Sequence, residues 1–473
     1  MPGSGLVRGA CVGKRVLYFF ARKDMRMIKF PSPAVSIVGR HNSGKTTLIE
    51  KLIAELVGRG LDVGSVKHHS HVGFDIDIPG KDSWRHRHAG ASETVIAAPG
   101  QMARIQTTDG EAECADIVAS MPGHDVVIVE GYRKSGLPTI EIMRAGNKAD
   151  ARTAEVFAEG ARKGWALGTD FTQFGRGSMP YAAEAHPDDR PVEQPLGQAE
   201  EDRLARSNPD HADISNKMPT AATVAVVTDI PLAAEAAGMY GVPAFDIDDV
   251  AGLADFLQAS FARPRVSMVI QAGGESRRMG RSKATVPFCG RPLICRLVER
   301  LSPVADELII TTNEPKELAF LQEQYPELGI RFESDVINER GALPGLYTAL
   351  RCARNPYVAV VACDMVLASP SLVVAEALEM TRTGADVVVP VNKHGFEPFH
   401  AIYRRSGCLP AVREALNEGE KRAQVFFNQV NVCEFPQKKV LEAEPMGGCF
   451  MNANTPDELA ALERIIQDRI ECE

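Results

Sequence analysis

The chain has 473 residues, a length that predicts roughly two to three domains. Apolar residues make up 44% of it and charged residues 24%, so each domain can bury a normal hydrophobic core. The formal net charge of −9 argues against general nucleic-acid binding, which needs a basic surface. Single nucleotides remain plausible ligands, because backbone amides, a few lysines and a metal ion can hold their phosphates.

The cysteines and apolar segments exclude further classes of protein. Ten cysteines are present without a CxxC pair, which argues against a disulfide framework and a structural zinc site. No apolar run approaches the ~18–20 residues of a membrane helix. The patch at residues 16–20 lacks a signal-peptide cleavage site, and residues 1–30 are expected to be an extension. We therefore expect a cytoplasmic protein.

The first unit is expected over residues 31–262 and starts with an apolar strand, a glycine loop and a helical pattern. A polar stretch at about 146–218, poorest in large apolar side chains over 182–218, is expected to be an insertion. Alternation of strands and helices predicts a parallel α/β sandwich. The predicted strands lie at 34–38, 62–66, 125–129, 222–228 and 242–247.

The second unit is expected over residues 266–473, after a linker near 262–265. Its strands and helical patterns alternate in the same way, so we expect a second parallel α/β sandwich. The predicted strands lie at 266–270, 307–312, 358–362 and 385–391, and the predicted helices at 293–301 and 372–381.

The loop after the first strand matches the phosphate-binding pattern GxxxxGK[ST] at every fixed position and precedes a predicted helix, as the pattern requires. Its glycines let backbone N–H groups turn towards a phosphate, and the helix N-terminus adds partial positive charge. Lys45 is expected to bridge the β- and γ-phosphates and Thr46 to ligate Mg²⁺; a plain turn is the alternative. The predicted nucleotide contacts are Gly39, Asn42, Ser43, Gly44, Lys45, Thr46 and Thr47.

Two polar segments accompany this loop. Glu130 ends a buried strand, where it can reach the Mg²⁺ shell, although it could also be a simple strand-end cap. His68 and His69, which follow Lys67 and precede Asp75 and Asp77, lack the spacing of a zinc site. They indicate either a charged nucleotide-sensing or partner-facing loop or a plain solvated loop.

The segments GRHNSGKTTL, VKHHSHVGFDIDIPGKDSWRHRHAGA and VIVEGYRK resemble the MobB-type molybdopterin-guanine dinucleotide adapters, which are small P-loop GTP-binding proteins. The resemblance covers residues 33–145 and resumes over 222–260. It implies bound GTP, weak GTPase activity, assistance to a transferase and a homodimer through this unit. The polar insertion departs from the family and leaves the dimer surface open.

A second glycine loop, QAGGESRRMGRSK at residues 271–283, follows the first strand of the second unit. Ala272, Gly273 and Gly274 would bring backbone amides against a nucleotide. Arg278 and Lys283 can neutralise the triphosphate and the departing pyrophosphate. A turn with surface charges is the alternative.

Further candidates follow later strands of this unit. Asp364 is the first choice as Mg²⁺ ligand, because it ends a central strand; it could instead cap the next helix. Asn313 and Asp335 could contact base or ribose, or be ordinary turn formers. Thr455, with Pro456 and Glu458, predicts a helix start. Asn452 and Asn454 would share one face of the extended segment before it and could reach the metal or the second substrate.

The motifs VIQAGGESRRMGRSK, GRPL, TTN, ESD, ACDM and FMNANTPDEL resemble the MobA-type molybdenum cofactor guanylyltransferases over residues 266–470. The resemblance implies a Rossmann-like nucleotidyltransferase domain that transfers GMP from Mg·GTP to the phosphate of molybdopterin and releases pyrophosphate. It implies GTP contacts from Ala272, Gly273, Lys283, Asn313, Asp335 and Asp364, with Asp364 also holding Mg²⁺.

Three departures leave alternatives open: Gln271 replaces Leu, Ser282 replaces Asp, and GALPG at 341–345 replaces GPLAG. The resemblance implies that the last loop faces the base, so cytidylyl transfer, sugar-phosphate substrates and a non-catalytic GTP-dependent carrier remain rivals. Lys393, His394 and His400 are weaker candidates for the acceptor phosphate. Expected protein partners are molybdopterin-loading proteins and apo-molybdoenzymes, with no nucleic acid and no membrane.

Overall fold

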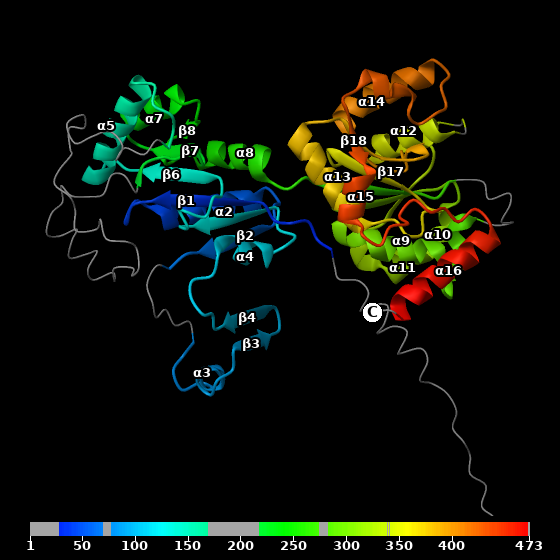
Figure 1. The fold of residues 1–473 in the computed structure, drawn as a ribbon, viewed down its shortest axis with the longest axis horizontal. Coiled ribbons are helices and arrows are strands. Elements are labelled where there is room, and N and C mark those ends of the chain that lie inside the picture. Colours follow the sequence, from blue (N-terminus) through cyan, green and yellow to red (C-terminus); the bar gives the residue numbers. More distant parts are fainter. Residues whose placement is uncertain are drawn as a thin grey trace, which may run out of the picture. The chain divides into compact units, whose positions relative to one another are not determined.

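The computed structural model describes residues 28–69, 77–168, 217–273, 282–337, 339 and 341–471. The chain divides into two compact units (Figure 1). One comprises Pro31–Arg263, and the other comprises Pro264–Glu473 together with residues 28–30 of the described chain. Each unit is built around its own sheet.

The sheet of the first unit has six strands, and every pair of neighbours runs parallel. The strand that leads into the first glycine loop lies inside the sheet, so its carboxyl end is flanked on both sides. The order is β2 (Val63–Lys67), β5 (Val126–Glu130), β1 (Ala34–Gly39), β6 (Thr139–Met143), β7 (Thr223–Thr228) and β8 (Ala244–Phe245).

Helices cover both faces of this sheet. On one face, α2 (Lys45–Gly58) and α8 (Val250–Phe261) pack on β1 and β5. Leu48, Leu52 and Leu56 recur every four residues along α2, and burial of each such side chain is worth roughly 1.5–3 kcal/mol. The opposite face carries α4 (Cys114–Ala119), α5 (Lys148–Arg162) and α7 (Pro231–Met239).

Several elements of this unit were not expected from the sequence, among them β6 and α5. β6 contains Glu141, and this acidic residue hides the apolar pattern that would predict a strand. Glu141 is only 2% exposed in the structure, where Arg133 pairs with it at 2.6 Å. The polar stretch begins with the amphipathic helix α5, which buries Ala154 and Phe157. Asn147 caps this helix through the backbone N–H of Ala149. The remainder of the stretch, 169–216, lies outside the described residues.

A β-hairpin forms a separate two-stranded sheet in the first unit (Figure 1). Its antiparallel strands are β3 (Glu93–Ala98) and β4 (Gln101–Gln106), and the short helix α3 (Asp82–His88) precedes them. Most residues of both strands are exposed, including Val95, Ile96 and Met102.

The second unit has an eight-stranded mixed sheet, which corrects the expectation of a purely parallel one. β17 lies between β14 and β15 and runs antiparallel to both. The short connections that join β15, β16 and β17 leave no room for a crossover helix. The order is β13 (Arg331–Glu333), β12 (Glu307–Thr311), β9 (Val266–Gln271), β14 (Tyr357–Ala362), β17 (His400–Arg404), β15 (Val387–Asn392) and β16 (Gly395–Phe396), with β18 (Val432–Pro436) beside β15.

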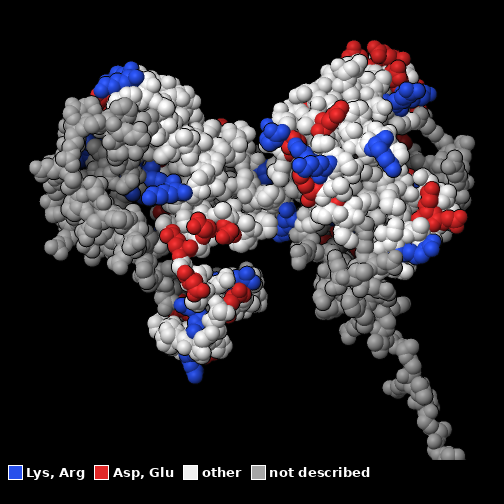
Figure 2. All heavy atoms as spheres, in the orientation of Figure 1, with Lys and Arg blue, Asp and Glu red and all other residues white. Residues whose placement is uncertain are grey.

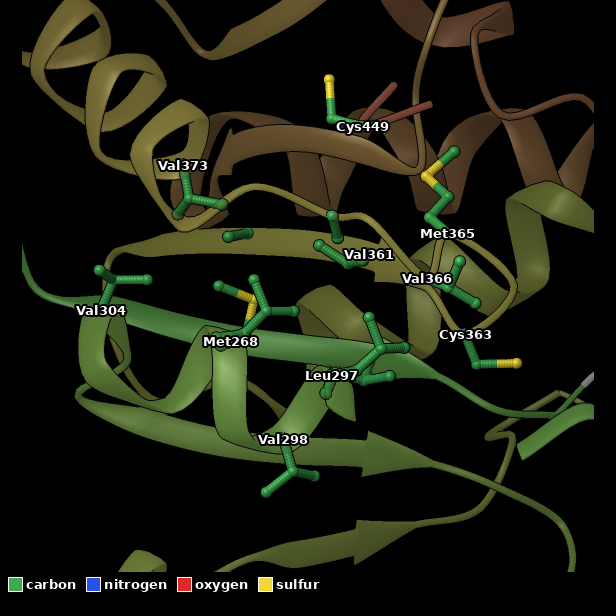
Figure 3. Packing of buried hydrophobic residues seen from close by; sticks show 14 of the residues in the cluster. Met268, Leu297, Val298, Val304, Val361, Cys363, Met365, Val366, Val373 and Cys449 are labelled. Carbon is green, nitrogen blue, oxygen red and sulfur yellow. The ribbon is translucent and has the colours of Figure 1, made fainter. Parts of the chain in front are cut away.

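Two helical layers cover this sheet. Met268, Leu297 and Val361 belong to the larger core, part of which is shown in Figure 3. On that side lie α9 (Leu293–Leu301), α10 (Pro315–Leu318), α11 (Phe320–Gln324), α13 (Pro370–Thr383), α15 (Gln437–Ala443) and α16 (Pro456–Glu471). The other side carries α12 (Ala342–Cys352) and α14 (Arg405–Asn417). Shorter elements are the strands Pro287–Phe288 and Arg291–Pro292 and the 3₁₀ turns Lys283–Thr285, Ser302–Val304, Pro326–Leu328 and Val425–Gln429.

The surfaces of both units carry charges of both signs. On the face drawn in Figure 2, acidic and basic side chains are interspersed over the described residues. None of the described helices combines the length and apolar character needed to cross a bilayer.

Candidate functional site

The first glycine loop connects the carboxyl end of β1 to the start of α2. Asn42 and Gly44 adopt positive φ angles of 58° and 82°, which turn the loop around the helix N-terminus. The amine of Lys45 donates to the backbone oxygens of Gly39 at 3.2 Å and Arg40 at 2.6 Å. Burial lowers the pKa of this amine. The lysine is thus folded back over its own loop.

The predicted magnesium ligands of this unit meet in the fold. The hydroxyl of Thr46 donates to Oε1 of Glu130 at 3.0 Å, at the end of the neighbouring strand β5. No side chain caps the N-terminus of α2, and its first turn holds no acidic residue. The hydroxyl of Ser43 is buried without a partner among the described residues. Unpaired donors at a helix N-terminus suit an anion such as phosphate.

The histidine segment has ordinary partners. His68 stacks on Tyr132 with ring centroids 4.2 Å apart and pairs with Glu111 at 2.5 Å. Asp77 accepts a hydrogen bond from Ser83 at 2.7 Å, and Asp75 lies outside the described residues. Nowhere in the described chain do three or more His, Cys, Asp or Glu side chains form a metal-binding group.

Three predicted residues of the second unit come together at the carboxyl edge of its sheet. The amine of Lys283 donates to Oδ2 of Asp364 at 2.8 Å and to Oδ1 of Asn454 at 2.7 Å. Lys283 and Asp364 are each about one-fifth exposed, so the cluster can be reached from solvent. The backbone N–H of Ala453 donates to the carbonyl of Asp364, which fixes the Asn454 segment beside it.

The helix start after Asn454 forms as expected. Glu458 accepts hydrogen bonds from the backbone N–H groups of Asn454 at 2.7 Å and Thr455 at 3.2 Å, and Thr455 accepts from Glu458 N–H at 3.2 Å. The first turn of α16 therefore positions Asn454. Asn452 is exposed and does not join the Lys283–Asp364–Asn454 cluster in the described chain.

A second polar group lies at the same edge of the sheet. Asn313 donates through Nδ2 to Oδ2 of Asp335 at 2.8 Å and accepts from Asp335 N–H at 3.1 Å. A Cβ atom on Gly273 would lie 3.6 Å from that carboxylate. Gly273, Asn313 and Asp335 therefore border one space, whereas Gly274 and Arg278 lie outside the described residues.

Gln271, the last residue of β9, carries a buried amide nitrogen without a hydrogen-bond partner in the described chain. This nitrogen lies 3.4 Å from the position of a Cβ atom on Gly345, within the GALPG segment at the start of α12. Gln271, which departs from the family, thus lies against the segment that contains another departure.

A cavity of about 490 Å³ lies near the chain segment that supplies Asn454. Its lining residues are Asn392, Lys393, His394, Glu397, Gln437, Gly448, Phe450 and Met451. Lys393 and His394 therefore line one cavity, whereas the prediction for His400 is wrong. His400 is fully buried, accepts a hydrogen bond from Ser369 N–H at 3.1 Å and packs edge-on against Phe450, so it cannot meet a phosphate.

Comparison with known proteins follows this division of the chain. Residues 268–432 match the family model "MobA-like NTP transferase domain", and residues 34–158 match "Molybdopterin guanine dinucleotide synthesis protein B". A "Probable molybdenum cofactor guanylyltransferase" of Natranaerobius thermophilus is 31% identical over 196 residues, which cover 41% of this chain and 93% of that protein. The chain belongs to the molybdenum cofactor guanylyltransferase family. It joins a MobB domain to a nucleotidyltransferase domain.

Solved structures resemble each half. Molybdopterin-guanine dinucleotide biosynthesis protein A from Archaeoglobus fulgidus is 27% identical, covers 43% of this chain and 99% of its own, and gives a TM-score of 0.38. MobB of Bacillus subtilis is 20% identical, covers 48% of this chain and 98% of its own, and gives a TM-score of 0.28.

The Lys283–Asp364–Asn454 cluster fits a magnesium ion. Mg²⁺ takes oxygen ligands and usually needs only one or two carboxylates besides phosphates and water. Asp364 uses Oδ2 for Lys283, which leaves Oδ1 for a cation in the described structure. The MobB domain offers the Thr46 hydroxyl and Glu130 in the same manner.

Sequence reasoning missed functional candidates in both halves of this guanylyltransferase. Phe450, Gln437 and Glu397 line the cavity, but they come from separate segments and share no motif. Arg144 lies beside the first glycine loop, with Nη1 3.0 Å from a Cβ position on Gly44. Arg144 could have been found from its position directly after strand β6. That strand was not predicted, because its sequence contains the charged residue Glu141.

Proposed function

We propose that the nucleotidyltransferase domain transfers GMP from Mg·GTP to molybdopterin or Mo-molybdopterin, forming the guanine dinucleotide cofactor. The observation that carries this proposal is the convergence of Lys283, Asp364 and Asn454 at the carboxyl edge of the sheet. A cationic amine and a carboxylate in one place are groups that phosphoryl chemistry requires.

The reaction needs no nucleophilic side chain. A phosphate oxygen of molybdopterin forms a bond to the α-phosphorus of GTP, the bond from that phosphorus to the β-phosphate oxygen breaks, and pyrophosphate leaves. Mg²⁺ held by Asp364 would neutralise charge on the triphosphate. Lys283 stabilises the growing charge of pyrophosphate, and Asn454 and Asp364 hold its amine in place until then. Asn313 and Asp335 bind the nucleoside.

The cavity beside Phe450 is proposed as the acceptor site. Phe450 offers an aromatic surface to a pterin ring, and Lys393 and His394 offer donors to its phosphate. Met451 lines the cavity and Asn454 contacts Lys283 three positions later, so acceptor and catalytic cluster share one chain segment.

The MobB domain is proposed to bind GTP through residues 39–47, with Mg²⁺ between Thr46 and Glu130. In this proposal residues 31–262 and 266–473 are the two domains of a cytoplasmic protein, and the first assists the second. Molybdopterin-loading proteins and apo-molybdoenzymes are its proposed partners.

The β3–β4 hairpin supports a proposed homodimer through the MobB domain. An isolated two-stranded hairpin is marginally stable in water, and this one exposes Val95, Ile96 and Met102. A second copy can cover these side chains by symmetry. Light scattering should give a dimer for the wild type and a monomer for Met102→Lys combined with Ile96→Lys; a wild-type monomer would refute the proposal.

Pyrophosphate release tests the transferase reaction. Purified protein with Mg²⁺ and molybdopterin receives each nucleoside triphosphate in turn, and Asp364→Ala serves as the inactive variant. Release with GTP, lost in Asp364→Ala but kept in Lys45→Ala, is expected. Release with CTP alone would move the protein to cytidylyl transfer. No release with any triphosphate, despite GTP binding by the MobB domain, would favour a non-catalytic carrier.

A further inference from the structure

One basic residue outside the first glycine loop lies against it. Arg144 directly follows β6, which pairs with β1 so that Ile142 lies opposite Gly39. The carboxyl ends of these strands therefore meet where α2 begins. A Cβ atom placed on Gly44 would lie 3.0 Å from Nη1 of Arg144, so the guanidinium lies against the last residue before the helix.

Two carboxylates, Asp229 and Asp150, hold Arg144 in this position. Its Nε donates to Oδ2 of Asp229 at 3.2 Å, and the N–H of Ala145 donates to Oδ1 of the same carboxylate at 2.5 Å. The backbone N–H of Arg144 donates to the buried Asp150 at 3.1 Å. The side chain is 39% exposed, so one edge of the guanidinium is anchored while Nη1 remains beside the loop.

The groups around the start of α2 favour binding of an anion. The first turn of α2 has neither a side-chain cap nor an acidic residue, and the amine of Lys45 lies over the same loop. A guanidinium presents several N–H donors in a plane and binds phosphate in a fixed geometry. We propose that Arg144 donates hydrogen bonds to the phosphate chain of the nucleotide held by the first glycine loop. This inference rests on the proposed binding of GTP there.

The position of Arg144 also fixes which phosphates it contacts. In loops of this kind, the backbone amides before the helix surround the α- and β-phosphates, and the lysine extends to the γ-phosphate. Arg144 lies beside Gly44, which is one of the loop residues that precede the helix. Its contact is therefore to phosphates that GTP and GDP share.

Titration of fluorescent GTP and GDP analogues tests this contact in a full-length chain that carries Lys283→Ala and Asp364→Ala, because these changes remove the proposed nucleotide contacts of the second domain. This double variant serves as the wild-type reference for every comparison below. Arg144→Ala should weaken both ligands about 10-fold to 100-fold, as expected for one lost hydrogen bond to a charged group. Arg144→Lys should lose less, because an ammonium keeps the charge without the planar donors. Arg162→Ala, at the exposed end of α5, is the matched control and should bind as the wild type.

Other outcomes would overturn the inference. Wild-type affinity in Arg144→Ala would do so, as would a loss confined to GTP. Asp229→Asn breaks the ion pair but keeps the guanidinium, so an equal loss of affinity there, with an equal fall in the melting temperature, would mean that Arg144 acts only on folding. Lack of nucleotide binding by the wild type, or unchanged binding by Lys45→Ala, would instead refute the GTP site itself and the role of Arg144 with it.

Discussion

Lys283 lies between two oxygen acceptors that differ in charge. The carboxylate of Asp364 can also hold a cation, whereas the amide of Asn454 can only orient the amine. Asn452, two residues before Asn454, is also an asparagine, but in the described chain it is exposed and lies outside the cluster. The two asparagines have the same side chain, so the residue type cannot tell which of them contacts Lys283. Their positions before α16 decide it.

We predict that Asn454→Ala lowers kcat of guanylyl transfer about 10-fold to 100-fold, because one hydrogen bond to a charged amine is lost and Lys283 is held less firmly. Steady-state kinetics with GTP measure this effect. Asn417→Ala, at the exposed end of α14, serves as the control and should leave kcat unchanged. An unchanged kcat in Asn454→Ala would assign this side chain no part in positioning Lys283.

We predict that Gln271→Leu stabilises the nucleotidyltransferase domain by about 1–2 kcal/mol, because it removes a buried amide nitrogen that lacks a partner. Leucine has a similar volume, so the space against Gly345 stays filled. Urea titration can follow this domain through labelling of the buried thiol of Cys408, read from its own peptide by mass spectrometry because other free thiols are present. A lower stability of the leucine variant would show that water or another group satisfies the amide.

At the scale of elements, a buried acid joins α13 to β17. Glu376 and His400 are both fully buried, with 3.5 Å between Oε1 and Nδ1. Burial raises the pKa of Glu376 to about 7, although the neighbouring His400 opposes the shift. Because the folded pKa lies above its ordinary value of 4.5, the folded state retains a proton that the unfolded state has released.

We therefore predict that the nucleotidyltransferase domain loses stability as pH rises from about 4.5 to about 7 through this group. Glu376→Gln cannot ionise, so above pH 7 it should be more stable than the wild type by up to about 3 kcal/mol and similar to it at pH 4.5. Urea titrations of the wild type and the variant over this pH range, followed by circular dichroism, measure the difference. Parallel curves for both proteins would contradict the prediction.

Elements with a strong local signal could be predicted from the sequence, and those stabilised by distant partners could not. The predicted strands followed apolar runs such as 358–362, and the helix 293–301 was predicted with its observed bounds. β6 was missed because Arg133 neutralises Glu141 only in the folded chain. The antiparallel β17 was missed because strand direction depends on connections, and its His400 was assigned to a phosphate because burial is not visible in a motif.

At the scale of the whole molecule, the proposed function places two nucleotide sites on one chain. A tether of this kind gives an effective concentration in the millimolar range. We predict that cutting protease sites inserted at residues 31 and 264, where the chain passes between the two units, slows guanylyl transfer at micromolar protein, because the MobB domain then has to meet the other domain by diffusion. Raising the protein concentration should restore the rate. Equal rates before and after cleavage at low concentration would show that the domains work independently.

The contact between Lys283 and Asn454 spans 171 positions of the sequence, and Glu458 of α16 fixes its far end. A ribosome adding about 5–20 residues per second needs roughly 10 to 30 s to travel from one partner to the other. During that interval the MobB domain has already left the exit tunnel and can bind its nucleotide, while Lys283 and Asp364 still lack their third partner. Premature translation products that end within this interval would therefore contain a complete P-loop and an incomplete transferase site.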